Sequence, residues 1–158
     1  MKRLTIQILV GIVVLAGTAF LIAGERPWFD MQNCVFCKPW METGLMKVMQ
    51  DNQYPMSNGV VTVSTVPATR MADYKKVCGQ MDALGKRAMS GEKLQMCQSC
   101  ETMGSFFARG AKMEQIWTKD GSVSMLTSSD STLVADMQKW AQRNMDERKK
   151  MGSAGAMK

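Results

Sequence analysis

The chain has 158 residues, 46% of them hydrophobic, with a formal net charge of +6 and no histidine. The absence of histidine excludes a histidine-based catalytic triad, a haem c attachment and a zinc finger of mixed cysteine and histidine ligands. The basic residues are spread along the chain except at 148–150, so we expect no nucleic-acid partner. No carboxylate pair, phosphate loop or nucleophile elbow is present, and we therefore expect a non-enzymatic protein.

An uncharged, mainly apolar run covers residues 4–23, and Lys2 and Arg3 precede it. As a helix, this run would be about 30 Å long, enough to cross the hydrocarbon core of a bilayer. The positive residues in front of it predict that the N-terminus stays inside and that the rest of the chain is exported. We therefore predict a signal-anchor helix over residues 1–24, a membrane partner through residues 4–23, and a domain that faces the periplasm or the cell exterior. A signal peptide cleaved after the small residues that end the run is the alternative.

The rest of the chain contains the same order of motifs twice. A CxxC pair at 34–37 recurs at 97–100, a shift of 63 positions. Each pair is followed by a glycine turn and an alternating run, with Asn58-Gly59 in the first half and Asp120-Gly121 in the second, a shift of 62. The shared order of CxxC, turn, strand and helix predicts an internal duplication.

Each glycine turn predicts a β-hairpin. Asn-Gly and Asp-Gly are strong signals for a two-residue hairpin turn, because both central positions of the favoured turn need positive φ. We expect residues 54–57 to pair with 60–66 in the first half, and residues 115–118 to pair with 122–128 in the second.

A helix is predicted before and after each hairpin. Pro39 marks the start of the first helix, whose stripe includes Met41 and Leu45. Asp130 or Ser129 is a good N-cap for the last helix, which is expected to run to about residue 150. The two remaining helices are predicted at about 70–90 and 101–111.

Together these elements predict an α+β fold, in which an N-terminal transmembrane or signal helix precedes two tandem helix-strand-strand-helix repeats. A single hairpin is marginally stable in water, so the repeats are expected to share one four-stranded antiparallel sheet, with the helices most simply on one face. The predicted domains are a signal-anchor helix at 1–24, a linker at 25–33, a duplicated α+β domain at 34–150 with copies at about 34–91 and 92–150, and a flexible tail at 151–158.

Five cysteines need an explanation in an exported chain, where free thiols tend to be oxidised or bound to metal. Cys78 stands alone on the apolar face of its predicted helix, and we expect it to act as a small buried hydrophobic residue. The other four form the two CxxC pairs, Cys34 with Cys37 and Cys97 with Cys100.

Three kinds of chemistry fit the CxxC pairs. If a pseudo-two-fold axis relates the two copies near these pairs, four thiolates converge and can bind Zn²⁺ or Cu(I). The pairs could instead form structural disulfides, which are common in exported domains. A CxxC at a helix N-terminus also has a lowered thiol pKa, which suits thiol–disulfide redox chemistry. We predict a soft-metal site between the repeats, with a disulfide-stapled structural or interaction domain and a redox protein as the alternatives; the protein partner is left open.

Methionine is frequent, with 17 residues. Thioethers can bind Cu(I), and Met46 and Met49 are spaced i, i+3 after the first CxxC. Most methionines, however, occupy positions that a helix or strand would bury, so we expect them to fill the core. Trp28 and Trp40 are expected either as anchors at the membrane interface or as core aromatic residues.

Overall fold

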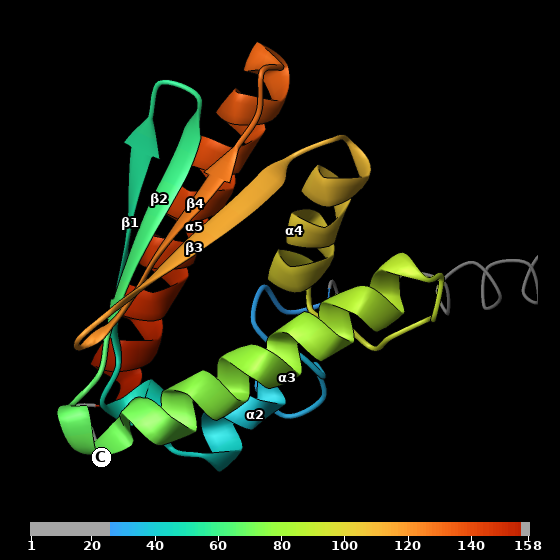
Figure 1. The fold of residues 1–158 in the computed structure, drawn as a ribbon. Coiled ribbons are helices and arrows are strands. Elements are labelled where there is room, and N and C mark those ends of the chain that lie inside the picture. Colours follow the sequence, from blue (N-terminus) through green and yellow to red (C-terminus); the bar gives the residue numbers. More distant parts are fainter. Residues whose placement is uncertain (1–25, 156–158) are drawn as a thin grey trace, which may run out of the picture.

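The computed structural model describes residues 26–155 of the chain (Figure 1). The predicted signal anchor at 1–24 lies outside the described residues, and so do residues 156–158 of the predicted tail. Within residues 26–155, no helix is both long enough and apolar enough to span a bilayer. The membrane anchor therefore stays a prediction from the sequence.

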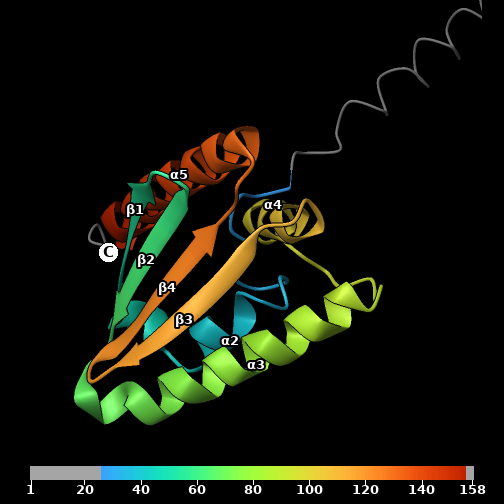
Figure 2. The same cartoon turned by 45° about the horizontal axis from the view of Figure 1, so that its top comes forward.

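Four strands of seven residues form one sheet, and every neighbouring pair of strands is antiparallel. The order across the sheet is β1-β2-β4-β3, so the two hairpins meet through their second strands (Figure 2). The prediction of a four-stranded antiparallel sheet is confirmed. The strands are β1 (Gln50–Met56), β2 (Gly59–Thr65), β3 (Lys112–Thr118) and β4 (Gly121–Thr127).

Four α-helices accompany the sheet in the described part of the chain, as predicted. They are α2 (Lys38–Glu42), α3 (Met71–Met89), α4 (Gln98–Ala108) and α5 (Ser131–Gly155), with short 3-10 turns η2 (Leu45–Lys47) and η3 (Ala68–Arg70). The last helix begins as the sequence indicates, because the Asp130 Oδ1 accepts hydrogen bonds from the backbone N–H groups of Thr132 and Leu133, at 2.8 and 3.2 Å. It runs on to Gly155, past the predicted end near residue 150.

The first helix is much shorter than the apolar stripe suggested. It ends at Glu42, and Gly44 then adopts a left-handed conformation with φ of 69°, which a glycine accommodates without steric cost. Leu45 is fully buried after this bend, whereas Met41 remains 46% exposed. The two side chains therefore do not form one buried helical stripe.

The glycines of the two hairpins have a role other than the predicted one. The two loop residues are Ser57 and Asn58 in the first hairpin, so Gly59 already pairs with Met56 as the first residue of β2. A Cβ at Gly59 would lie 1.9 Å from the carbonyl oxygen of Leu126 on β4. Glycine is needed there because the two central strands approach closely, and not because of a turn with positive φ at both central residues.

The second hairpin repeats this arrangement. Its glycine, Gly121, is the first residue of β4, and a Cβ there would lie 1.9 Å from the carbonyl oxygen of Ser64. The two hairpins also have registers that are offset by 62 positions, since Gln50 pairs with Thr65 and Lys112 pairs with Thr127. The origin of this arrangement by duplication stays a prediction.

The helices contact one face of the sheet, which we call the inner face. Tyr74 of α3 shares a hydrogen bond of 2.7 Å with the hydroxyl of Ser122, and Arg148 of α5 pairs with Asp51. The register places Ser122 and Asp51 on the same side, because both pair with Ser64. Two core clusters result, one between the sheet, α4 and α5 and one around Leu45 under α3.

Replacing Gly59 with alanine should lower the free energy of unfolding by about 1 to 3 kcal/mol, because the new methyl group would force β2 and β4 apart. Gly104→Ala is the matched control, since Gly104 lies in α4 and a methyl group added there would meet no neighbouring group within 4 Å. This control should stabilise the protein by about 0.5 to 1 kcal/mol. Urea denaturation of both variants would contradict the close-approach argument if the two changes had the same sign.

Candidate metal centre

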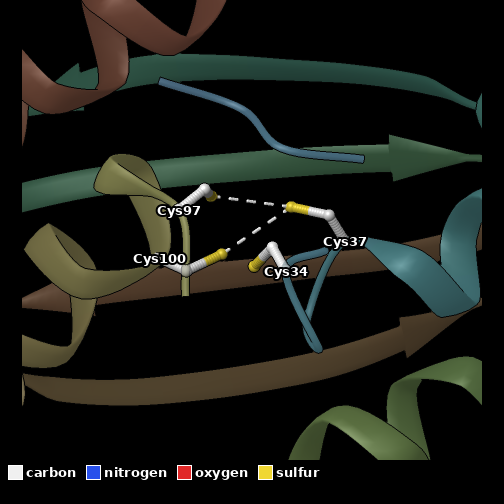
Figure 3. A group of neighbouring side chains, drawn as sticks. All are labelled: Cys34, Cys37, Cys97 and Cys100. Carbon is white, nitrogen blue, oxygen red and sulfur yellow. Dashed lines mark hydrogen bonds between the residues drawn. The ribbon is translucent and has the colours of Figure 1, made fainter. Parts of the chain in front are cut away.

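The two CxxC pairs come from different halves of the chain and meet in space (Figure 3). Cys34 and Cys37 lie in the turn that leads into α2, and Cys37 occupies the N-cap position of this helix. Cys97 occupies the N-cap position of α4, and Cys100 lies in the first turn of that helix. The side chains of all four point toward a common centre, as the sequence analysis anticipated.

The spacing of the four sulfur atoms fits a single tetrahedral ion. The Cys37 Sγ lies 3.7 Å from the Cys97 Sγ and 3.9 Å from the Cys100 Sγ, and all four sulfurs lie within 4.8 Å of one another. A tetrahedral ion with metal–sulfur bonds of about 2.3 Å separates its sulfur ligands by about 3.8 Å. Four cysteines in this arrangement could therefore hold a metal ion with little movement.

Three of the four cysteines are buried, and the fourth, Cys100, is partly exposed. Cys34, Cys97 and Cys37 are only 1%, 2% and 7% exposed, and Met31 and Phe36 pack against the group. Structural zinc sites take four protein ligands in this way, whereas catalytic sites keep one position for water or substrate. The burial therefore suits an ion that holds segments together better than one that meets a substrate.

Backbone hydrogen bonds fix the two cysteine segments relative to each other. The Val35 N–H donates to the carbonyl oxygen of Gln95 at 3.0 Å, just before the second pair. The Ser99 N–H donates to the carbonyl oxygen of Trp28 at 3.0 Å, just before the first. Inside the first pair, the Cys37 N–H donates to the Cys34 carbonyl oxygen at 3.0 Å, which closes the turn. These bonds hold the two segments together at the place where the four sulfurs meet.

Crowding divides the thiols into two that lose a proton readily and two that retain it. The pKa of Cys34 falls to about 6, because its sulfur accepts hydrogen bonds from Cys100 and Cys37. The pKa of Cys97 also falls, because its sulfur accepts hydrogen bonds from Cys100, Cys34 and Cys37. The pKa of Cys100 rises because it is hydrogen-bonded to Cys34, Cys37 and Cys97 and is desolvated.

The pKa of Cys37 is subject to opposing effects and is raised overall. Its hydrogen bond with Cys100 lowers its pKa, but hydrogen bonds with Cys34 and Cys97 and its burial raise the pKa more. A thiolate at every position would bring four negative charges together in a buried space. A bound cation compensates those charges and would make all four thiolates stable together.

Cys78 does not take part in this cluster. It is half-buried on α3, where it packs with the cluster around Leu45 and Tyr74, and burial raises the pKa of its thiol. This placement agrees with the expected role as a small hydrophobic residue. Met49 packs in the same cluster, whereas the methionine that touches the cysteines is Met31. The packing of Met49 agrees with the expectation that most methionines fill the core.

A buried polar network supports the second CxxC pair. The Ser99 hydroxyl, which lies between the two cysteines and is 3% exposed, donates to the Asn144 Oδ1 at 2.8 Å. The Trp28 Nε1 donates to the same oxygen at 2.8 Å, and the Trp140 Nε1 donates to the Ser99 carbonyl oxygen at 3.1 Å. The Asn144 Nδ2 in turn donates to Gln53 on β1 at 3.2 Å. One asparagine thus connects the entry segment, the cysteine helix and the sheet.

Sequence reasoning missed this network. Asn144 lies on the same helical stripe as Leu133, Met137 and Trp140, and a polar residue within such a stripe was the available signal. The sequence predicted Trp28 as a membrane-interface anchor or a core aromatic residue. In the structure, its indole N–H also holds the residue in position by a hydrogen bond to Asn144. Trp40 packs against Tyr74 in the second cluster, with ring centroids 5.8 Å apart.

Changing Asn144 to leucine should lower the free energy of unfolding by about 1 to 3 kcal/mol, because the Trp28 N–H and the Ser99 hydroxyl lose their acceptor in a buried place. It should also weaken metal retention, by less than the roughly 10- to 100-fold typical of a hydrogen bond made directly to a ligand, because Asn144 acts on the cysteines through Ser99. Gln142→Leu on the exposed side of α5 is the control. Competition with a chromophoric chelator measures retention, and equal retention in both variants would contradict a supporting role for Asn144.

The chain matches no protein-family model, and comparisons with curated proteins and with solved structures find no match either. No relative therefore supplies a function. The chemistry of the four cysteines carries the functional argument.

Proposed function

We propose that this chain is an exported, membrane-anchored, non-enzymatic module that binds one thiophilic metal ion through Cys34, Cys37, Cys97 and Cys100. The observation that carries the proposal is the convergence of four sulfurs within 4.8 Å from two distant segments. Zinc is the first candidate, because a tetrahedral set of four sulfur ligands is typical of Zn²⁺ or an iron–sulfur centre. Cu(I) is the second candidate, since thiolates also select it.

The proposed role of the ion is to connect parts of the domain that otherwise share little core. The first cysteine pair continues into α2 and the cluster around Leu45, and the second begins α4, which packs in the cluster with α5 and the sheet. The cysteines form a third cluster of their own. An ion there would tie both core clusters to the segment that enters from the predicted membrane anchor.

A disulfide-stapled domain is the alternative that the same geometry favours next. The Cys37 and Cys97 sulfurs are 3.7 Å apart, compared with about 2.05 Å in a disulfide, so a small movement would allow oxidation across the two pairs. A redox enzyme is less well supported. The lowered pKa of Cys34 suits a nucleophilic thiol, but this side chain is only 1% exposed and a partner disulfide could not reach it.

The protein purified without oxygen should contain one zinc or Cu(I) ion per chain, and removal of the ion should add four thiols to those that react with a labelling reagent. Cys97→Ser should reduce the affinity for the ion at least about 100-fold, because one missing thiolate opens the tetrahedral site. Cys78→Ser should leave stoichiometry and affinity unchanged. Elemental analysis with thiol counting decides the matter: a metal-free protein with four unreactive cysteines would establish the disulfide alternative.

Metal binding should release about two protons per ion near neutral pH, because Cys34 and Cys97 have lowered pKa values while Cys37 and Cys100 hold their protons. Protons compete with the ion, so affinity falls as the pH falls, and it should fall more steeply once Cys34 is protonated below about pH 6. Calorimetry in buffers of different ionisation enthalpy counts the protons. Release of about four would show that the thiols titrate independently.

A further inference from the structure

The face of the sheet that lies away from the helices, which we call the outer face, is apolar. Its centre consists of two rows that run across the strands and alternate with the inner-face residues. The apolar members of these rows are Tyr54, Val61, Val63, Ile116, Val123 and Met125. None of the six belongs to a core cluster of the described residues, and Figures 1 and 2 show no described helix over this face.

The two edge positions of this patch are open to solvent. Tyr54 on β1 is 53% exposed and Ile116 on β3 is 57% exposed, although both are large hydrophobic residues. Every residue of β3 is exposed, so this strand has neither a neighbour at its outer edge nor cover on the outer face within residues 26–155. An exposed apolar patch of this kind usually marks a surface that another molecule covers.

The middle of the inner face is more polar than the middle of the outer face. The row across its middle is Gln53, Thr62, Ser124 and Gln115, and all four side chains are polar. The row beside it supplies Val60 and Leu126 to the core with α4 and α5. A sheet that packs only against its own helices would place its valines on the inner face and its polar residues in water. Here the face with most of the valines is the outer one, so burial by a partner explains the pattern better than burial within one copy.

The charges on the outer face fit a partner with the same surface. Lys112 and Glu114, both on β3, are the only charged residues that the strands place on this side. Their charges cancel, so two copies would not repel each other. A single lysine gives little attraction to an anionic bilayer, which peripheral membrane surfaces normally meet with several basic residues.

The patch also presents matching residues in its two halves. Positions with the same offset of 62 carry Val61 and Val123, Val63 and Met125, and Tyr54 and Ile116, each pair apolar. A surface with this approximate two-fold arrangement can meet a copy of itself so that apolar side chains face apolar side chains. Such self-matching contacts are the commonest way in which soluble chains associate.

We propose that two copies of this chain pack against each other through the outer faces of their sheets, forming a two-sheet sandwich across a two-fold axis. Four strands about 4.8 Å apart and seven residues of about 3.3 Å give a face of about 19 by 23 Å. This area lies below the roughly 800 Å² per partner of a standard stable interface. The dimer is therefore reversible and forms at micromolar concentration or above.

The test uses the full metal-loaded chain in a mild detergent, followed by sedimentation equilibrium from low to high micromolar concentration. The molar mass should rise toward that of a dimer, and hydroxyl-radical labelling of Tyr54 should fall over the same range. Ile116→Glu and Tyr54→Glu, made separately, should each weaken dimerisation at least tenfold. Both positions are more than half exposed, so neither change is expected to disturb the fold. Ala135→Glu on the exposed side of α5 should dimerise like the wild type.

Three results would overturn the proposal. A wild-type chain that stays monomeric throughout the range has no such dimer. A glutamate variant that dimerises as well as the wild type would place the interface elsewhere, including in the predicted membrane segment. Binding of the monomer to zwitterionic lipid vesicles that Ile116→Glu abolishes, without self-association, would make the outer face a membrane surface.

Discussion

The pairing of β2 with β4 joins the two halves of the chain, and the four-stranded sheet and the core between it, α4 and α5 both require it. Gly59 and Gly121 permit it, since each lies against a carbonyl oxygen of the opposite strand where any Cβ would collide. β1 and β3 begin at opposite ends of the sheet, because Gln50 lies level with Gly121 and Lys112 lies level with Gly59. The two cysteine segments are joined instead by their own backbone hydrogen bonds, such as the one from the Val35 N–H to the Gln95 carbonyl oxygen.

The sulfur cluster then has an electrostatic constraint of its own. Four thiols within 4.8 Å cannot all lose their protons unless a cation is present, and hydrogen bonds between them already hold two in the thiol form. In the exported location that the sequence predicts, the same proximity would make oxidation easy. The site therefore offers two chemical states that both fasten α2 to α4, and the metal-bound state uses all four sulfurs with their present spacing.

A buried hydrogen-bond network around Asn144 orients the segments that carry the cysteines. The Asn144 side-chain oxygen accepts hydrogen bonds from Trp28 and Ser99. Among the described residues, no buried side-chain nitrogen or oxygen lacks a hydrogen-bond partner. This buried network specifies one arrangement of the entry segment and the cysteine helix, since a shift of either would leave a donor unsatisfied. The middle row of the inner face is polar, although Val60 and Leu126 beside it are buried in the core, and the outer face carries the other three strand valines.

The kinds and order of the elements could be predicted from the residues alone: two hairpins, the helices around them, one antiparallel sheet and the four cysteines of the candidate site. These follow from local rules, such as alternation along a strand, the N-cap at Asp130 and the spacing within CxxC. The folded chain was needed to learn why Gly59 must be glycine, that Met31 and not Met49 touches the sulfurs, and that Asn144 connects three segments. These features are contacts between residues far apart in the chain, and a local pattern carries no information about which distant group a side chain will meet.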